Sequence, residues 1–161
     1  MMMTESQIDQ ARTELERIKG NCLYSAQAYF EAAKSAELWG RLMVFLPACV
    51  TAISGLLLAL GIDRKYGAIS ATAGAIAATA SFLGSTKKAT DFLSSARSYT
   101  VLRHKVHSEL SFLDEQSDFS ATKEKAQELN SEYMRIAAAD TPVPNRHFTK
   151  AVKRIEQGAA D

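Results

Sequence analysis

The sequence predicts an all-α protein in which a two-helix transmembrane hairpin continues into a cytoplasmic helical stalk or bundle. Two observations point to the hairpin: residues 42–62 and 67–86 carry no charged side chain, and only a short polar link separates them. A third points to the stalk, because apolar residues in the charged flanking segments recur in steps of three and four. No alternating pattern typical of a β-strand occurs.

The charge distribution is uneven along the chain. The protein has 161 residues, about one domain, and a mean hydropathy of -0.12 that would suit a soluble protein. Between Leu42 and Thr86, however, the only charged residues are Asp63, Arg64 and Lys65. The net charge of +1, with Lys and Arg interspersed among Asp and Glu, gives no basic face and therefore argues against nucleic acid as a partner.

The first segment, residues 1–41, is predicted to be a cytoplasmic amphipathic helix. Its seam residues follow the three–four spacing of a helix that packs on another helix. They are Ile8, Ala11, Leu15, Ile18, Cys22, Ser25, Tyr29, Ala32, Ala36 and Trp39. We interpret the seam chiefly as core packing, and a sensor or partner surface is the alternative.

Residues 42–62 form the stronger predicted span, a run of 21 uncharged residues dominated by large apolar side chains. At 1.5 Å per residue the run would measure about 31 Å, which matches the hydrocarbon core of a bilayer. Pro47 would break a helix in water but is tolerated within a membrane, where it is expected to produce a kink. Trp39, Arg41 and Tyr66 are placed to anchor the ends at the interface.

Residues 63–66 are predicted to be a tight turn, and residues 67–86 to be the second span. The second run is poor in Leu, Ile and Phe, so it needs the stronger span beside it to enter the bilayer. A buried hairpin in a soluble four-helix bundle is the alternative.

Small residues dominate one face of each span, which favours close helix packing. On the first span this face carries Ala48, Ala52, Gly55 and Ala59. The candidates for helix packing or pore lining are Ala52, Gly55, Ser70, Gly74, Ser81 and Ser85, with Lys87 and Lys88 at the cytoplasmic mouth. Hydroxyl groups at membrane depth can bond to their own helix, to a neighbouring helix or, in an oligomer, to water in a pore.

Cations near the span ends predict the orientation. Seven flank the two runs and two lie in the turn; the seven are Lys34, Arg41, Lys87, Lys88, Arg97, Arg103 and Lys105. The positive-inside rule then places both termini in the cytoplasm and the protein in the inner membrane as a multi-pass protein. The start MMMTESQIDQ lacks the pattern of a cleavable signal, so insertion is expected to rely on internal segments.

Residues 87–161 are predicted to be cytoplasmic helices. The first runs to about Leu113 and is expected to continue from the second span. Its seam contains Ala89, Phe92, Ala96, Tyr99, Val106, Leu110 and Leu113 and is interrupted at Arg103. The next helix is expected to have Ser120 as its N-cap and a seam of Ala126, Leu129, Tyr133 and Ile136. The last is expected to be capped by Asn145 and to carry Phe148, Val152 and Ile155.

The sequence shows no pattern of an enzyme active site or a cofactor-binding loop, so we expect no catalytic residues, cofactor or metal. His104 and His107 lie three residues apart, but with no third ligand nearby they are interpreted as exposed helix residues. Cys22 and Cys49 are too far apart along one helix to form a disulfide bond, which is consistent with a reducing compartment.

The layout resembles the SLATT superfamily, the two-transmembrane effector domains of prokaryotic conflict systems, so that residues 1–161 would form a single SLATT-like domain. The resemblance covers roughly residues 21–157. It rests on YSAQAYFEAAKSAELWGRL, the charge-poor hairpin, STKKATDFLSSARSYTVLRHKV and TPVPNRHFTKAV, in which a proline-containing turn precedes a short helix. The second span is sparser than the family pattern, and no sensor or enzyme domain is fused to it.

The resemblance implies a homo-oligomeric effector in antiviral defence that forms pores or disrupts the inner membrane. The signal would come from a separately encoded sensor, often one that makes a nucleotide second messenger. A membrane-anchored scaffold without a pore and a soluble helical binding module are the alternative functions.

Overall fold

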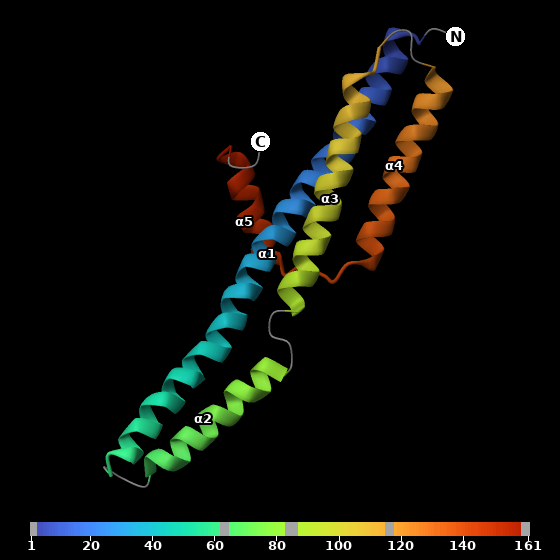
Figure 1. Cartoon of the computed structure of the whole chain (residues 1–161). Coiled ribbons are helices and arrows are strands. Elements are labelled where there is room, and N and C mark those ends of the chain that lie inside the picture. Colours follow the sequence, from blue (N-terminus) through green and yellow to red (C-terminus); the bar gives the residue numbers. More distant parts are fainter. Residues whose placement is uncertain (1–2, 62–64, 83–86, 115–117, 159–161) are drawn as a thin grey trace. The chain divides into compact units, whose positions relative to one another are not determined.

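The computed structural model describes residues 3–61, 65–82, 87–114 and 118–158. These residues form five α-helices and no strand, which confirms the all-α prediction (Figure 1). The helices are α1 (Glu5–Ala59), α2 (Lys65–Phe82), α3 (Lys87–Ser111), α4 (Phe119–Ala139) and α5 (Asn145–Glu156).

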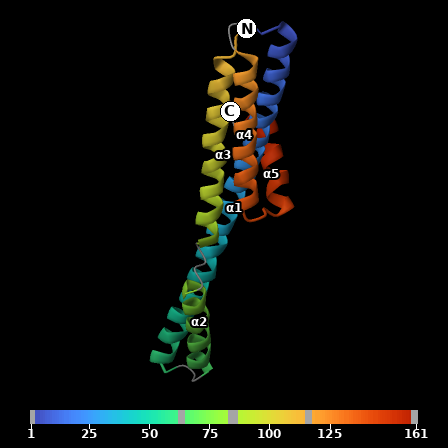
Figure 2. The ribbon, with the colours of Figure 1, turned by 90° about the vertical axis from the view of Figure 1, so that its right-hand side faces the viewer.

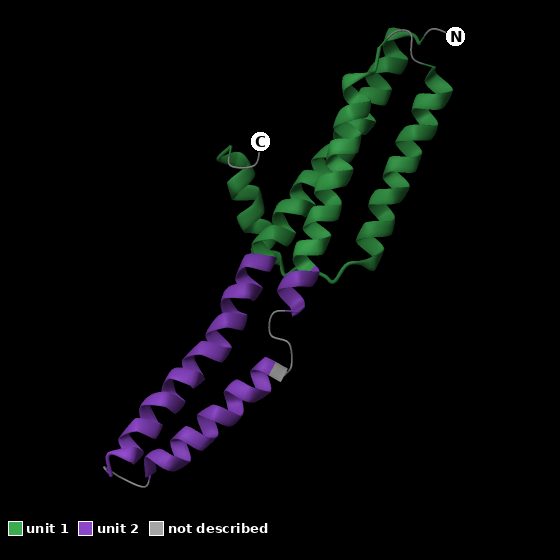
Figure 3. Ribbon diagram, viewed as in Figure 1, with its two compact units in different colours: residues 1–32, 92–161 green, residues 33–91 purple. Residues whose placement is uncertain are grey.

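The chain divides into two compact units, which Figure 3 draws in different colours. The bundle unit consists of Met1–Ala32 and Phe92–Asp161, and the apolar unit consists of Ala33–Asp91. The division falls within α1, so one helix supplies residues to both units.

The core of the bundle unit lies among the N-terminal part of α1, α3 and α4, which run side by side in both ribbon views (Figures 1 and 2). Its buried members are Leu15, Ile18 and Cys22 of α1, Leu102 and Val106 of α3, and Ala126 and Leu129 of α4. Six of these seven residues belong to the predicted seams, whereas Trp39, also predicted for the α1 seam, is 56% exposed. Leu102 is the core residue that was not among the predicted seam residues. It lies three residues after Tyr99, whereas the predicted seam followed the four-residue step to Arg103 and was interrupted there.

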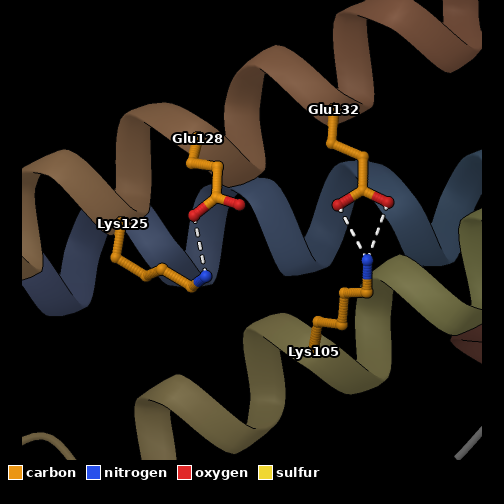
Figure 4. A network of polar contacts seen from close by, with 4 residues as sticks. All are labelled: Lys105, Lys125, Glu128 and Glu132. Carbon is orange, nitrogen blue, oxygen red and sulfur yellow. Dashed lines mark hydrogen bonds and ion pairs between the residues drawn. The ribbon is translucent and has the colours of Figure 1, made fainter.

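Ion pairs add to this packing on the outside of the bundle unit. Lys105 of α3 donates to both carboxylate oxygens of Glu132 of α4, at 2.9 and 3.0 Å (Figure 4). Lys125 pairs with Glu128 one turn along α4, at 2.7 Å. Such exposed pairs contribute little, about 0.2–1 kcal/mol each, so the apolar core holds the three helices together.

The last helix, α5, is fixed to the N-terminal half of α1. Arg154 pairs with Glu31, and the Tyr29 hydroxyl donates to the Thr141 carbonyl oxygen at 3.1 Å, just before α5. His147 and Ala151 are the buried positions of α5, whereas the predicted Phe148 is half exposed. The buried face is thus offset by about one residue from the predicted one.

Two helix starts differ from their predictions. Asp118, not Ser120, caps α4, since its side chain accepts a hydrogen bond from the Ala121 backbone N–H at 3.3 Å. Asp satisfies the free N–H groups of a first turn at least as well as Ser, and it comes earlier in the chain. At α5 the cap position is Pro144, and Asn145 is already helical.

In the apolar unit α1 remains helical through Pro47 and ends at Ala59, three residues before the predicted end at Ile62. Gly61 has φ 75°, a left-handed conformation that glycine adopts without steric cost and that commonly terminates a helix. Lys65 and Tyr66, predicted to be part of the turn, belong to α2. The remaining turn positions 63 and 64, and positions 83–86 at the end of the predicted second span, lie outside the described residues.

Candidate functional site

The outward surface of α1 in the apolar unit is covered with large apolar side chains. They are Leu38, Trp39, Met43, Phe45, Leu46, Val50, Ile53 and Leu56. The most apolar 18-residue window of α1 is long and hydrophobic enough to cross a membrane, and only 6% of it is buried. Among the described helices α1 alone meets this test, so the structure has one candidate membrane-spanning helix.

The opposite side of this segment contacts α2 through hydroxyl groups and backbone. The Ser70 hydroxyl donates to the Thr51 carbonyl oxygen at 3.2 Å. The Thr51 hydroxyl lies 2.9 Å from the Pro47 carbonyl oxygen on its own helix and 3.4 Å from the Ser70 carbonyl oxygen on α2. Because each residue contacts the carbonyl group of the other, the pair fixes the register of α2 against α1.

Glycine residues let the two helices approach closely on either side of this pair. A Cβ atom added at Gly74 would lie 3.7 Å from Thr51, and one added at Gly55 would lie 3.8 Å from the Ser70 hydroxyl. At Gly67 it would meet a methyl group of Leu58 at 3.3 Å, which is tighter than an ordinary contact. Larger side chains at these positions would therefore force the helices apart.

The predicted packing residues divide between the contact and the surface. Gly55, Ser70 and Gly74 lie in the α1–α2 contact, whereas Ala52 and Ser81 are exposed. Lys87 and Lys88, predicted to mark a cytoplasmic mouth, are also exposed. Ser85 lies outside the described residues.

The face of α1 that contacts α2 is offset from the predicted small-residue face. Ala48, Ala52 and Ala59 are exposed, and the contact runs instead through Thr51, buried Ser54, Gly55 and Leu58. On α2 the buried member of the contact region is Ala73. The available signal was the hydroxyl pair Thr51 and Ser54, three residues apart on one helical face.

The hydroxyl groups of α2 use two of the predicted bonding modes. Thr72 and Thr79 donate to the carbonyl oxygens four residues earlier, of Ala68 and Ala75, at 2.9 and 2.8 Å. Ser70 instead bonds across to α1. Ser70 is therefore the hydroxyl of α2 whose hydrogen bond holds two helices together.

In the bundle unit, three buried side chains, Cys22, Tyr29 and Tyr99, favour their neutral forms. Burial raises the pKa of the Cys22 thiol to about 11. Burial, with the carboxylate of Asp140 close by, raises the pKa of Tyr29 to about 12 and also raises the pKa of Tyr99. These shifts stabilise the neutral side chains of a core and activate no nucleophile.

Metal ligands do not cluster among the described residues. His104 and His107 are exposed on α3, as expected, and Cys22 and Cys49 are free thiols. The structure therefore offers a contact between helices, and an apolar surface beside it, as its candidate functional features.

Comparison with protein-family models, curated proteins and solved structures found no match to this chain.

Proposed function

We propose that the protein is an inner-membrane effector of the SLATT type, in which residues 42–62 and α2 form a two-helix transmembrane hairpin. In this proposal both termini lie in the cytoplasm, and several copies assemble to form a pore or disrupt the membrane. A separately encoded sensor, or the nucleotide second messenger that it makes, supplies the signal.

One observation carries the membrane part of the proposal, namely the exposure of the apolar window of α1. A helix this hydrophobic in the core of a soluble protein would be mostly buried, whereas here 6% of the window is buried. Isolated exposed apolar residues are common, but a continuous surface of this kind needs a covering, which lipid provides.

The α1–α2 contact supports placing α2 in the bilayer as well. By itself α2 is too weakly apolar to meet the test for a span. Helices in membranes associate through small residues and interhelical hydrogen bonds rather than through large apolar side chains, and Gly55, Gly74 and the Thr51–Ser70 pair supply both. A hairpin inserted as one body would give α2 the partner that it needs.

A two-helix hairpin cannot enclose a channel, so the effector activity requires an oligomer. Ala52 and Ser81, which the α1–α2 contact leaves exposed, are candidates for packing or pore lining between copies. A signal that binds one arrangement of the copies better than another would shift the assembly towards it.

The test is to induce the protein in bacterial cells and measure dye entry and membrane potential, with crosslinking to follow assembly. We expect dye entry and depolarisation, and we expect Gly74→Leu to abolish them, because a leucine side chain cannot fit against Thr51. Ala75→Leu is the matched control, since Ala75 is exposed on the same helix and lies on neither the face of Gly74 nor that of Ser81.

Depolarisation and crosslinking that persist in Gly74→Leu would contradict the packing role of this face. A protein that is retained in membranes but causes neither dye entry nor depolarisation when induced would favour the anchored scaffold instead.

A further inference from the structure

A groove of about 550 Å³ lies between the N-terminal turns of α1 and the first half of α4, within the bundle unit. Its volume falls in the range of small-molecule sites, about 300–1,000 Å³. Ala11 and Ala126, both buried, are among its lining residues, and their small side chains leave the space open. This groove is separate from the α1–α2 contact.

The lining offers hydrogen-bonding groups that a ligand can reach. The side-chain amides of Gln10, Gln127 and Asn130 belong to it, and Gln10 and Gln127 lie at exposed positions. Each carboxamide can both donate and accept, which suits a ligand with donors and acceptors side by side on one edge. The ring of Phe119 adds a flat apolar surface in the same groove.

The charges around the groove restrict the ligand. Among the residues that the structure describes, the lining contains one cation, Lys123, and two carboxylates, Asp9 and Glu14. Glu14 is held by Arg17, which donates to both of its oxygens at 2.9 and 2.6 Å. A ligand rich in phosphate needs several cations, so this lining favours an uncharged ligand.

We infer that the groove binds an uncharged adenine nucleoside. Asn and Gln amides pair in a bidentate manner with the N6 and N7 atoms of adenine, and aromatic rings stack on bases. Gln127 or Asn130 would read the adenine edge while Phe119 stacks on its face. The site is independent of the proposed effector function, since it needs no bilayer and no second copy.

The test is equilibrium dialysis of the full chain in detergent micelles against labelled adenosine, with guanosine and ATP as competitors. We expect saturable adenosine binding. Guanosine and ATP should compete with the labelled adenosine less well than unlabelled adenosine does. Phe119→Ala and Gln127→Leu should each weaken binding about tenfold, the loss expected for one stacking or one bidentate contact. Phe112→Ala and Gln157→Leu are matched controls at exposed positions outside the groove and should bind normally.

Helix content by circular dichroism shows whether each variant is folded, and only folded variants are compared. Absence of saturable adenosine binding to the wild-type chain would overturn the proposal. Binding that Phe119→Ala and Gln127→Leu leave unchanged, or a preference for ATP or guanosine over adenosine, would overturn it as well. A failed membrane-extraction or dye-entry experiment would leave this site untouched, so the two proposals fail separately.

Discussion

The two units use the apolar residues of a single helix, α1, in opposite ways. In the bundle unit Leu15 and Ile18 are each 1% exposed, because α3 and α4 cover them. In the apolar unit Ile53 and Leu56 are each 61% exposed. The chain therefore buries its large apolar side chains among its own helices in one unit and leaves them outside in the other, as expected if water surrounds the first and lipid the second.

The residue types that join the helices also differ between the two units. The bundle unit packs Leu, Ile and Val side chains into a core, which is favourable when the alternative is water. The apolar unit joins α1 to α2 through glycine, serine and threonine, which is favourable when the alternative is lipid. The kind of residue at each helix contact thus agrees with the surroundings that we propose for its unit, water for the bundle unit and lipid for the apolar unit.

The largest effect is expected from Leu102→Ala, which removes a side chain that is 0% exposed in the bundle core. The loss of buried surface and the cavity left behind should lower the free energy of unfolding by about 2–5 kcal/mol. Thermal unfolding followed by circular dichroism in detergent measures this change. Its neighbour Val101 is 55% exposed, and Val101→Ala should cost little. Equal losses of unfolding free energy in the two variants would contradict the placement of Leu102 in the buried core.

A smaller effect is expected from raising the pH, through two buried groups of the bundle unit. The pKa of Cys22 rises from 9.0 to about 11 on folding, and that of Tyr29 from 10.0 to about 12. Because folding favours the neutral forms, their contribution to stability is complete below pH 9 and is lost as the pH rises towards 11 and 12. Cys22→Ala should show a weaker dependence on pH between 9 and 11 in denaturant titrations. An identical dependence would rule out this role for the thiol.

The smallest effect is expected from Ser70→Ala, which removes the hydrogen bond from α2 to the Thr51 carbonyl oxygen. Interhelical hydrogen bonds in membranes contribute about 0.6 kcal/mol and at most about 1.7 kcal/mol. Thr72→Ala removes a hydroxyl that bonds only within its own helix and should change less. Disulfide trapping between cysteines introduced on α1 and α2 would measure how often the helices separate. If Thr72→Ala loosens the contact as much as Ser70→Ala does, the register does not depend on this bond.

Sequence patterns predicted the bundle unit well because its packing depends on large apolar residues at helical spacing. Leu15, Ile18, Val106 and Leu129 all occupy predicted seams. Leu102 was missed because a three-residue and a four-residue step are equally allowed at that point, and Arg103 broke the pattern.

The α1–α2 contact was harder to predict. Small residues occur on several faces of both helices, so composition does not show which face is used. Of the candidate residues, Gly55, Ser70 and Gly74 lie in the α1–α2 contact, whereas Ala52 and Ser81 are exposed. In the deciding interaction the Ser70 hydroxyl donates to the Thr51 backbone carbonyl oxygen. Every residue has such a carbonyl group, so the sequence does not show which one is bonded.

The central claim is that the exposed apolar surface of α1 lies in lipid. The most direct test is an alkaline wash of membranes from cells that express the protein, followed by detergent. We predict that the protein stays in the membrane pellet through the wash, although its bundle unit is destabilised at that pH, and is released only by detergent. Release into the supernatant by the wash alone would contradict the claim and identify the chain as a soluble helical protein.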